Sequence, residues 1–164
     1  MLDKINKLLH YDIETGTFTY KVSVRYGLEK GSIAGTIQSN GYVTIRISGK
    51  DYKAHRVAWL IVTGEWPDQC IDHINRKRSD NRFCNLREAT RAQNVLNAKV
   101  RKDSRTGLKG IYFDEASKKY KVVIRKDGKQ HYVGRFKTPE EAVSAHKIAA
   151  YELHGDFSYY VYNG

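Results

Sequence analysis

Hydrophobic residues in the first third of the chain recur first with helical and then with strand spacing. The apolar residues between Leu2 and Leu9 fall on one helical face, which predicts a short amphipathic helix. Alternating positions on both sides of Ser39-Asn40-Gly41 predict a β-hairpin. The elements expected in this part are a helix at 2–9, a turn at 12–16, strands at 17–21, 33–37, 42–47 and 52–54, and a buried helix at 55–63 closed by Gly64.

The pattern then changes to strand, loop, strand and helix between residues 70 and 98. Residues 71–74 read as the end of a strand, and the polar, basic residues 75–83 read as a loop. A short strand at 86–89 precedes Thr90-Arg91-Ala92-Gln93, in which the Thr and Gln side chains can satisfy free backbone amides at a helix start. The pattern predicts a compact ββα unit whose helix runs over about 91–99.

The last third predicts a three-stranded antiparallel sheet followed by one helix. Strands are expected at 109–114, 120–126 and 129–136, the last two joined by an Asp127-Gly128 turn. Thr138-Pro139-Glu140-Glu141 marks a helix start, and Gly155 marks its end. The fold class is therefore α+β. We expect a domain at 1–98 with a β-rich leader and a ββα core at about 70–98, a basic linker at 99–107, and a second domain at 108–160.

The charge of the chain indicates a polyanionic partner. Its 164 residues carry a net charge of +11, with a sequence pI near 9.6. The excess is spread over both predicted domains, with 15 basic against 10 acidic residues in 1–98 and 14 against 8 in the remainder. Such a footprint is typical of nucleic-acid binding, although a basic surface kept for solubility is the alternative.

Neither a membrane segment nor a disulfide framework is expected. The longest apolar run, residues 57–62, is too short to cross a bilayer, and no secretory leader follows Met1. The chain has only two cysteines, Cys70 and Cys84, and it is long enough to fold without stabilising disulfide bonds. The sequence predicts a soluble protein of a reducing compartment, the cytoplasm.

Five residues in the ββα pattern suggest metal-assisted hydrolysis of a phosphodiester. Asp72 and the amide oxygen of Asn94 are hard ligands that suit Mg²⁺ or Mn²⁺, with phosphate and water completing the shell. His73 titrates near neutrality and, as the next residue along the strand, faces away from Asp72 toward an attacking water. Asn85 is expected to accept a hydrogen bond from the far nitrogen of His73, and Arg91 to grip the phosphate.

These residues also carry a family resemblance. The run from Ala54 to Asn94, with Asp-His, Asp-Asn-Arg, Asn-Leu-Arg and a late Asn, resembles HNH endonucleases of the phage and intron-homing type. The resemblance covers most of residues 1–98 and implies the same roles: His73 as base, Asp72 and Asn94 as ligands of one divalent ion. It further implies a homing-type enzyme, in the host cytoplasm if phage-encoded. Arg76 departs from the pattern, because the family often has Gly there.

A structural zinc site is the alternative use of the cysteines. Cys70 and His73 are three residues apart, with Cys84 nearby, but strand alternation places the first two on opposite faces. No second Cys/His pair has ligand spacing. We therefore expect no structural zinc and interpret the cysteines as small buried hydrophobic residues.

Residues 109 to about 157 resemble the ethylene-response-factor (APETALA-type) DNA-binding domain. The match lies in Lys109-Gly110-Ile111, the strand 120–125, Tyr132 to Phe136, and Glu140-Glu141-Ala142. In that family a three-stranded sheet lies in the major groove, although the plant domains have Trp where Tyr120 and Tyr132 stand. Strand parity puts Val122 toward the helix. The residues expected to contact double-stranded DNA, here and in the ββα loop, are Arg76, Arg82, Lys109, Tyr112, Lys121, Arg125, Gln130, Tyr132 and Arg135.

The sequence therefore predicts a metal-dependent DNA endonuclease, nicking or cutting both strands, which a C-terminal sheet positions on its site. The chain is expected to act as a monomer or weak dimer. The main alternative is a non-catalytic, sequence-specific DNA-binding regulator on the same fold. An RNA-binding factor is disfavoured, because a three-stranded major-groove sheet finds no wide major groove in RNA.

Overall fold

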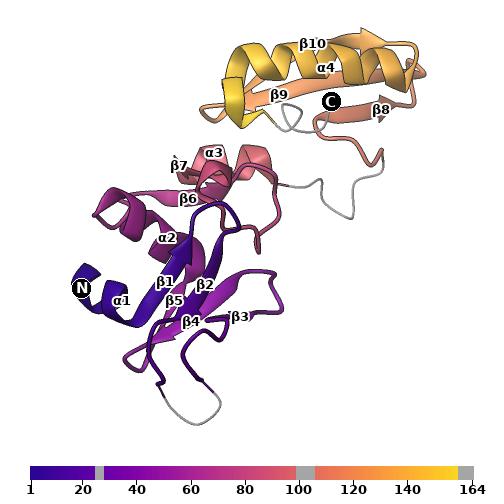
Figure 1. Ribbon diagram of the computed structural model, residues 1–164. Helices are drawn as coiled ribbons and strands as arrows, with labels where there is room; N and C mark the ends of the chain where they lie inside the picture. The colour runs from indigo at the N-terminus through magenta and orange to yellow at the C-terminus, as the bar shows by residue number, and fades with distance from the viewer. Residues whose placement is uncertain (25–27, 99–105, 159–164) are drawn as a thin grey trace. The chain divides into compact units, whose positions relative to one another are not determined.

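The computed structural model describes residues 1–24, 28–98 and 106–158 (Figure 1). Contacts divide the chain into two compact units, Met1–Arg91 and Ala92–Gly164. Residues 92–98, assigned from the sequence to the first domain, thus belong to the second unit. Of the predicted linker, residues 99–105 lie outside the described residues, as do 159 and 160 at the end of the predicted second domain. The domain limits of the sequence analysis stay a prediction.

The described residues of the first unit form three small antiparallel sheets and two α-helices. Its helices are α1 (Leu2–Leu8) and α2 (Ala54–Thr63), and η1 (Phe83–Asn85) is a single 3₁₀ turn. Its strands are β1 (Leu9–Asp12), β2 (Thr17–Tyr20), β3 (Thr36–Ile37), β4 (Val43–Ile47), β5 (Lys50–Lys53), β6 (Cys70–His73) and β7 (Leu86–Ala89). The strands pair as β1-β2, β3-β4-β5 and β6-β7. Gly64 ends α2 in the left-handed conformation with φ of 86°, as predicted.

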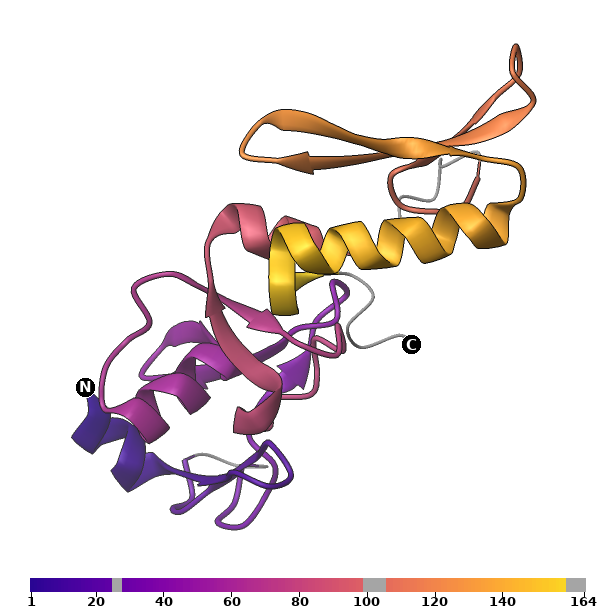
Figure 2. The same cartoon turned by 90° about the horizontal axis from the view of Figure 1, so that it is seen from above.

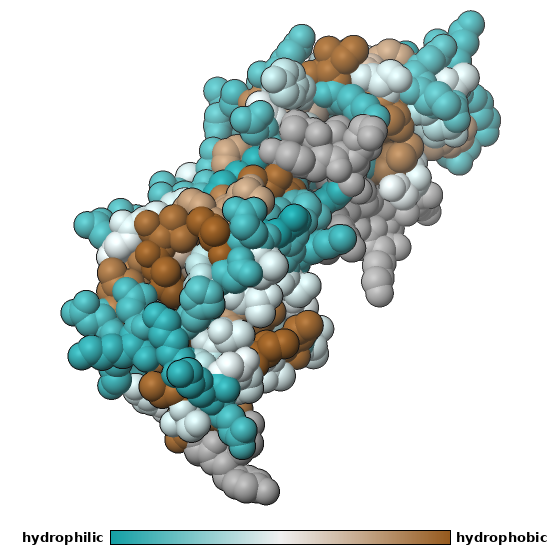
Figure 3. Space-filling view, viewed as in Figure 1, coloured by the Kyte–Doolittle hydropathy of each residue, from teal (hydrophilic) through white to brown (hydrophobic). Residues whose placement is uncertain are grey.

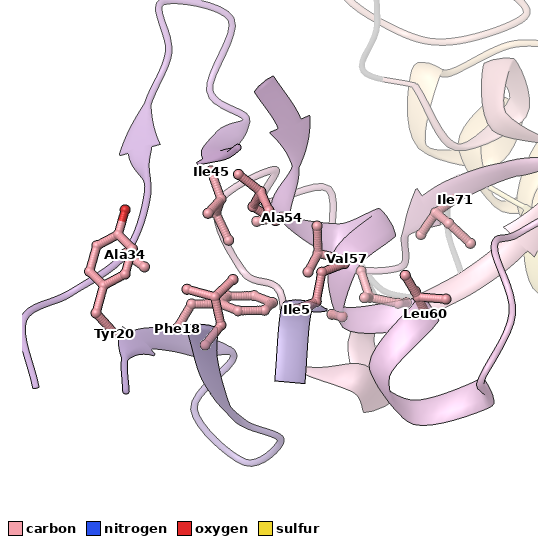
Figure 4. Close-up of a cluster of buried hydrophobic side chains, with 13 residues drawn as sticks. Ile5, Phe18, Tyr20, Ala34, Ile45, Ala54, Val57, Leu60 and Ile71 are labelled. Carbon is pink, nitrogen blue, oxygen red and sulfur yellow. The ribbon is translucent and has the colours of Figure 1, made fainter. Parts of the chain in front are cut away.

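One hydrophobic core joins these elements (Figure 4). Ile5 of α1, Ile45 of β4 and Val57 of α2 are fully buried in it. Strand β4 shows the alternation that fixes its facing, because Ile45 and Ile47 are buried while Arg46 between them is exposed. The core includes Ile71 of β6, directly before Asp72, and Leu86 of β7, so it anchors the strand that carries the candidate chemistry.

The second unit consists of α3 (Arg91–Asn97, whose first residue belongs to the first unit), an antiparallel sheet and a long helix. The strands β8 (Ile111–Asp114), β9 (Lys119–Lys126) and β10 (Lys129–Phe136) pair in the order β10-β9-β8. Figure 2 shows α4 (Pro139–His154) running along this sheet, and η2 (Gly155–Phe157) follows it. Both halves of the capping box predicted at the start of α4, between Thr138 and Glu141, are formed.

The α4 side of the β8–β10 sheet is apolar, and the other side carries charged and aromatic residues. Val122 and Ile124 of β9 are buried with Ala142 of α4, which confirms the predicted facing of the strand. Small residues on α4 let the helix approach the sheet closely. Arg125, with the opposite parity, is exposed. Figure 3 shows hydrophilic residues beside smaller hydrophobic patches on the visible face of this unit.

The α+β class predicted from the sequence is confirmed, since small antiparallel sheets and helices make up both units. The predicted ββα order is present as β6, β7 and α3. Among the residues that the structure describes, no helix combines the length and apolar character needed to cross a bilayer.

Candidate functional site

Asp72, near the end of β6, is held by a guanidinium from the neighbouring strand. Asp72 pairs with Arg87 across the β6-β7 ladder. The Nε and Nη2 atoms of Arg87 lie 3.0 and 2.8 Å from Oδ2 of Asp72. Both side chains are largely buried, with 6% of Asp72 and 14% of Arg87 exposed. The buried carboxylate therefore has a charged partner that fixes its orientation and offsets the cost of removing it from water.

His73, the last residue of β6, is buried beside an amide. Its Nε2 lies 3.4 Å from Oδ1 of Asn81, while Nδ2 of Asn81 donates to the carbonyl of Ser79 at 3.2 Å. An amide oxygen only accepts, so this contact requires the proton of the neutral ring to be on Nε2 and leaves the lone pair on Nδ1. Burial lowers the pKa of His73, partly opposed by the Asn81 hydrogen bond and the Asp72 charge. His73 is accordingly a neutral base near pH 7.

Asn85 has a different role from the one predicted. Its Oδ1 accepts from the backbone N–H of Asn75 at 2.9 Å, and its Nδ2 donates to the carbonyl of Asp80 at 2.8 Å. The side chain thus ties the two ends of the β6–η1 loop together instead of orienting the His73 ring. Asn81 contacts that ring, and sequence reasoning missed it although the residue lies inside the Asp-Asn-Arg motif. The Asn81 side chain is only 2% exposed, and burying an amide without a hydrogen-bond partner costs free energy, so its contacts are specific.

Two arginines of the same loop were predicted to contact DNA. Arg82 donates from Nε and Nη2 to Asp80 at 2.8 and 2.6 Å, and these contacts lower the pKa of Asp80 to about 2. The Arg82 charge is therefore already paired within the loop. Arg76 takes a left-handed backbone conformation with φ of 62°, and its N–H donates to the carbonyl of His73. Glycine adopts this conformation without strain, which fits the glycine that the family resemblance implies at this position.

A second histidine lies beside His73, from the start of α2. The rings of His55 and His73 meet edge to face with centroids 5.0 Å apart, and Tyr42 lies 5.3 Å from His55. Among the described residues, Nδ1 of His55 is buried without a hydrogen-bond partner. Burial, together with the nearby charges, lowers the pKa of His55 to about 3, so the ring is neutral. The sequence predicts no role for this histidine, which lies inside the run from Ala54 to Asn94.

Cations stand around the Tyr42 ring at this site. The guanidinium of Arg78 lies 4.8 Å from the ring centroid, and Nζ of Lys53 lies 5.3 Å from it. Cation–π contacts hold both charges near the ring at little cost in solvation. The imidazoles of His55 and His73 thus lie close to positive charge, an arrangement suited to an anionic substrate.

The cysteines differ from the prediction that both are buried. Cys70 is half-buried and Cys84 is exposed. Cys84 sits on η1 between Phe83, which packs against Trp59, and the buried Asn85, so the tight turn directs it outward. In the described ranges no three His, Cys, Asp or Glu side chains come together as a metal cluster.

Helix α3 carries Arg91, which is exposed, and Asn94, which is half-exposed. Its C-terminal end is capped by Lys109, whose ammonium lies 3.2 Å from the carbonyl of Val95 and 3.0 Å from that of Ala98 and also contacts the carbonyl of Leu96. Three carbonyls engage the three donors of an ammonium. The structure therefore gives Lys109 a helix-capping role, and the DNA contact predicted for it stays a prediction.

The exposed face of the β8–β10 sheet contains the remaining predicted contacts. Tyr112 and Tyr132 are 60% and 59% exposed. Strand pairing sets Tyr112 opposite Lys121, and Gln130 opposite Arg125, on one face. Arg135 is partly engaged, since its Nε lies 3.4 Å from Oδ2 of Asp114. The parity predicted for this face is confirmed, and its use in DNA binding stays a prediction.

Comparison with known proteins places the site in a family. A family model described as HNH endonuclease matches residues 52–96, which include β6, β7 and most of α3. Protein 3.8 of Escherichia phage T7 is 32% identical over 111 residues, covering 65% of this chain and 91% of that protein. The uncharacterized HNH endonuclease L560 of Acanthamoeba polyphaga mimivirus is 32% identical over 121 residues. This chain contains an HNH endonuclease domain at residues 52–96.

The part of the chain that the family model matches lies almost entirely in the first unit. The alignment with the mimivirus protein spans 73% of this HNH chain but only 62% of the length of that relative. Among solved structures, the HNH homing endonuclease I-HmuI, studied in DNA binding and cleavage, aligns with 84% of this chain and 76% of its own. The two share 21% sequence identity with a TM-score of 0.40. HNH nucleases generally use a divalent metal ion.

Proposed function

We propose that this HNH protein hydrolyses phosphodiester bonds of double-stranded DNA with His73 as the general base. The observation that carries the proposal is the buried, neutral His73 with Nε2 on Asn81, one residue after a carboxylate held by Arg87. A neutral imidazole of fixed tautomer can take a proton from water at Nδ1 near neutral pH. A histidine with a purely structural role would not need a fixed tautomer of this kind.

The residues fit one divalent ion, Mg²⁺ or Mn²⁺. The donors proposed for it are a carboxylate oxygen of Asp72 and the amide oxygen of Asn94, both of the hard type that these ions prefer. The proposal for Asn94 rests on the sequence pattern. When bound, such an ion would offset negative charge on the scissile phosphate. Arg87 would keep Asp72 oriented, and Arg91 is proposed to contact the phosphate.

The C-terminal sheet is proposed to position the nuclease on its site. Its outer face presents aromatic rings beside basic and amide side chains, a combination that can grip phosphate and contact base edges. The likeness to APETALA-type domains supports this reading, and the net charge of +11 agrees with a DNA partner. A phage or mobile-element homing role is proposed from the resemblance of residues 54–94 to homing-type HNH endonucleases.

A non-catalytic DNA-binding regulator is the second candidate, favoured by the paired state of Arg82 and by the exposed sheet of the second unit. Incubation with supercoiled plasmid in Mg²⁺ or in EDTA distinguishes the two. A nuclease converts the plasmid to open circles or to linear DNA only with the metal.

The matched variants are His73→Ala and, as control, His10→Ala, which removes an exposed imidazole from β1. We expect His73→Ala to lower the cleavage rate by about two to four orders of magnitude with unchanged DNA affinity. Equal rates for the two variants would contradict the role of His73, and a wild-type protein that binds DNA but never cuts it would favour the regulator.

A further inference from the structure

The main chain at Asn81, the residue that contacts His73, is held by the N-terminal hairpin β1-β2. The hydroxyl of Tyr11, on β1, donates to the carbonyl oxygen of Asn81 at 2.7 Å, across 70 positions of sequence. The Tyr11 ring stacks on Phe18 of β2, with centroids 4.7 Å apart. Burial raises the pKa of Tyr11 well above its usual value, so the hydroxyl keeps its proton and acts as donor. A specific polar contact therefore links the hairpin to the loop that bears Asn81.

The turn of the same hairpin packs against the same peptide bond, between Asn81 and Arg82. Gly16 has φ of +70°, and a Cβ built on it would lie 2.4 Å from the backbone N of Arg82 and 2.6 Å from the carbonyl carbon of Asn81. Only a residue without a side chain permits this approach. The turn is itself shaped by Asp12, whose carboxylate accepts from the N–H groups of Glu14 and Thr15.

The Asn81–Arg82 peptide is thus fixed by a hydrogen bond to its carbonyl and by direct packing against a glycine. Asn81 is 2% exposed, and its amide is oriented at both ends by Ser79 and His73. Displacement of the backbone at this point would move Oδ1 away from Nε2 of His73, in a contact that at 3.4 Å has little length to spare.

We propose that the β1-β2 hairpin is a positioning element of the nuclease site. In this arrangement Tyr11 and Gly16 hold the main chain of Asn81, and Asn81 in turn keeps the proton of His73 on Nε2. The Nδ1 atom is then the one that accepts a proton from water. This inference rests on the proposed function for its kinetic consequence, whereas its structural claim concerns the tautomer of one histidine and can be measured without any cleavage.

The test compares Tyr11→Phe with Tyr20→Phe in the full-length protein. Tyr20 lies on β2 of the same hairpin, and its hydroxyl makes no hydrogen bond to the described residues, so it is a matched control for the loss of one oxygen. We expect Tyr11→Phe to lower kcat about fivefold to tenfold, the range typical of one lost hydrogen bond, with KM within about twofold of wild type. Tyr20→Phe should leave both constants unchanged, with circular dichroism confirming the folded state of each variant.

The second measurement is the tautomer of His73, observed by ¹⁵N NMR of the imidazole. This tautomer should change only if Tyr11 and Asn81 position the ring, and not if they merely stabilise the fold. We expect the Nε2–H form in wild type and Tyr20→Phe, and a mixture of both tautomers in Tyr11→Phe and Asn81→Leu. Asn81→Asp keeps an oxygen acceptor and should restore the Nε2–H form. Gly16→Ala should act in the same direction as Tyr11→Phe.

The outcomes separate this proposal from the proposed function. If Asn81→Leu and Tyr11→Phe both kept the wild-type tautomer and the wild-type kcat, the positioning role would be overturned. A tautomer shift in these two variants, in a protein that cleaves no DNA, would support the positioning role and reject the nuclease function.

Discussion

Replacing Arg87 by Met tests how strongly the site depends on the buried pair with Asp72. The substitution keeps most of the side-chain length but removes the guanidinium that donates two hydrogen bonds to Oδ2 of Asp72. Removing one partner of a buried ion pair costs about 3–5 kcal/mol, because the remaining charge loses its compensation. Since Arg87 keeps 14% exposure, water can reach part of the site, and we expect about 3 kcal/mol. That corresponds to a fall in Tm of about 15 °C for a unit of this size.

The matched control is Arg46→Met, which breaks the ion pair between Arg46 and Asp51. Its atoms are 3.8 Å apart, and both side chains are well exposed, at 70% and 62%. Such surface pairs contribute about 0–1 kcal/mol, so the control should unfold almost like wild type. Both tryptophans of the chain lie in the first unit, so urea unfolding followed by tryptophan fluorescence in EDTA reports on this unit alone.

The reasoning fails if Arg87→Met and Arg46→Met unfold at the same urea concentration. A second comparison, with and without millimolar Mg²⁺, examines Asp72 as a metal ligand. A cation that binds only the folded form stabilises it by mass action, and we expect this gain in Arg87→Met and wild type but not in Asp72→Asn. A gain of equal size in Asp72→Asn would exclude Asp72 as a ligand.

In the second unit, Gly110→Ala should lower the free energy of unfolding by about 2–4 kcal/mol, because its Cβ would lie 2.5 Å from Nε2 of His146. Gly128 is also left-handed, but no atom lies within 4 Å of a Cβ built on it, so Gly128→Ala should lower the free energy of unfolding by only about 1 kcal/mol. Equal losses of stability in the two variants would contradict the close packing of Gly110 against His146. Burial lowers the pKa of His146 from 6.5 to about 4, so below pH 6.5 protons favour the unfolded chain. Stability should therefore fall between pH 6.5 and 4, and His146→Gln should flatten that decline in a pH series of urea unfolding curves. Arg125→Ala should lower the binding free energy for the preferred DNA site by about 1–3 kcal/mol and relax the preference for particular bases. Lys121→Ala should instead weaken binding to all DNA sequences alike. It should also lower by about one unit the slope of the logarithm of the binding constant against the logarithm of the salt concentration. Gel shifts at several salt concentrations measure the affinity and its salt dependence for each variant. Unchanged binding in both variants would exclude this sheet as the surface that recognises DNA.

Features set by neighbouring residues were predictable from the sequence. The capping box at Thr138, the Gly64 helix end and the β9-β10 turn at Asp127-Gly128 depend on a few adjacent side chains, and each forms as expected. The facing of β9 follows from a period of two, so Val122 could be placed inside and Arg125 outside. Local chemistry therefore determined most of the elements.

Which polar groups meet inside a loop was not predictable in the same way. Asn81 and Asn85 are both amides in one motif, and only the path of the β6–η1 loop decides which of them reaches His73. Arg82 resembled a phosphate contact because the sequence did not show that Asp80 would pair with it. The bond from Tyr11 to Asn81 spans 70 positions, and no periodicity encodes such a contact.

The capping of α3 by Lys109 bears on how such enzymes exchange parts during evolution. The carbonyls of Val95, Leu96 and Ala98 receive their donor from a residue beyond the predicted linker. A recombination event that joined a new C-terminal module at residues 99–107 would remove this lysine and leave the last carbonyls of α3 to water. The helix that carries Asn94 would then lose support unless the incoming module supplied a cation at the same point. We therefore expect functional chimaeras of this chain to keep a lysine or arginine there or to exchange the segment from residue 92 onward as one piece.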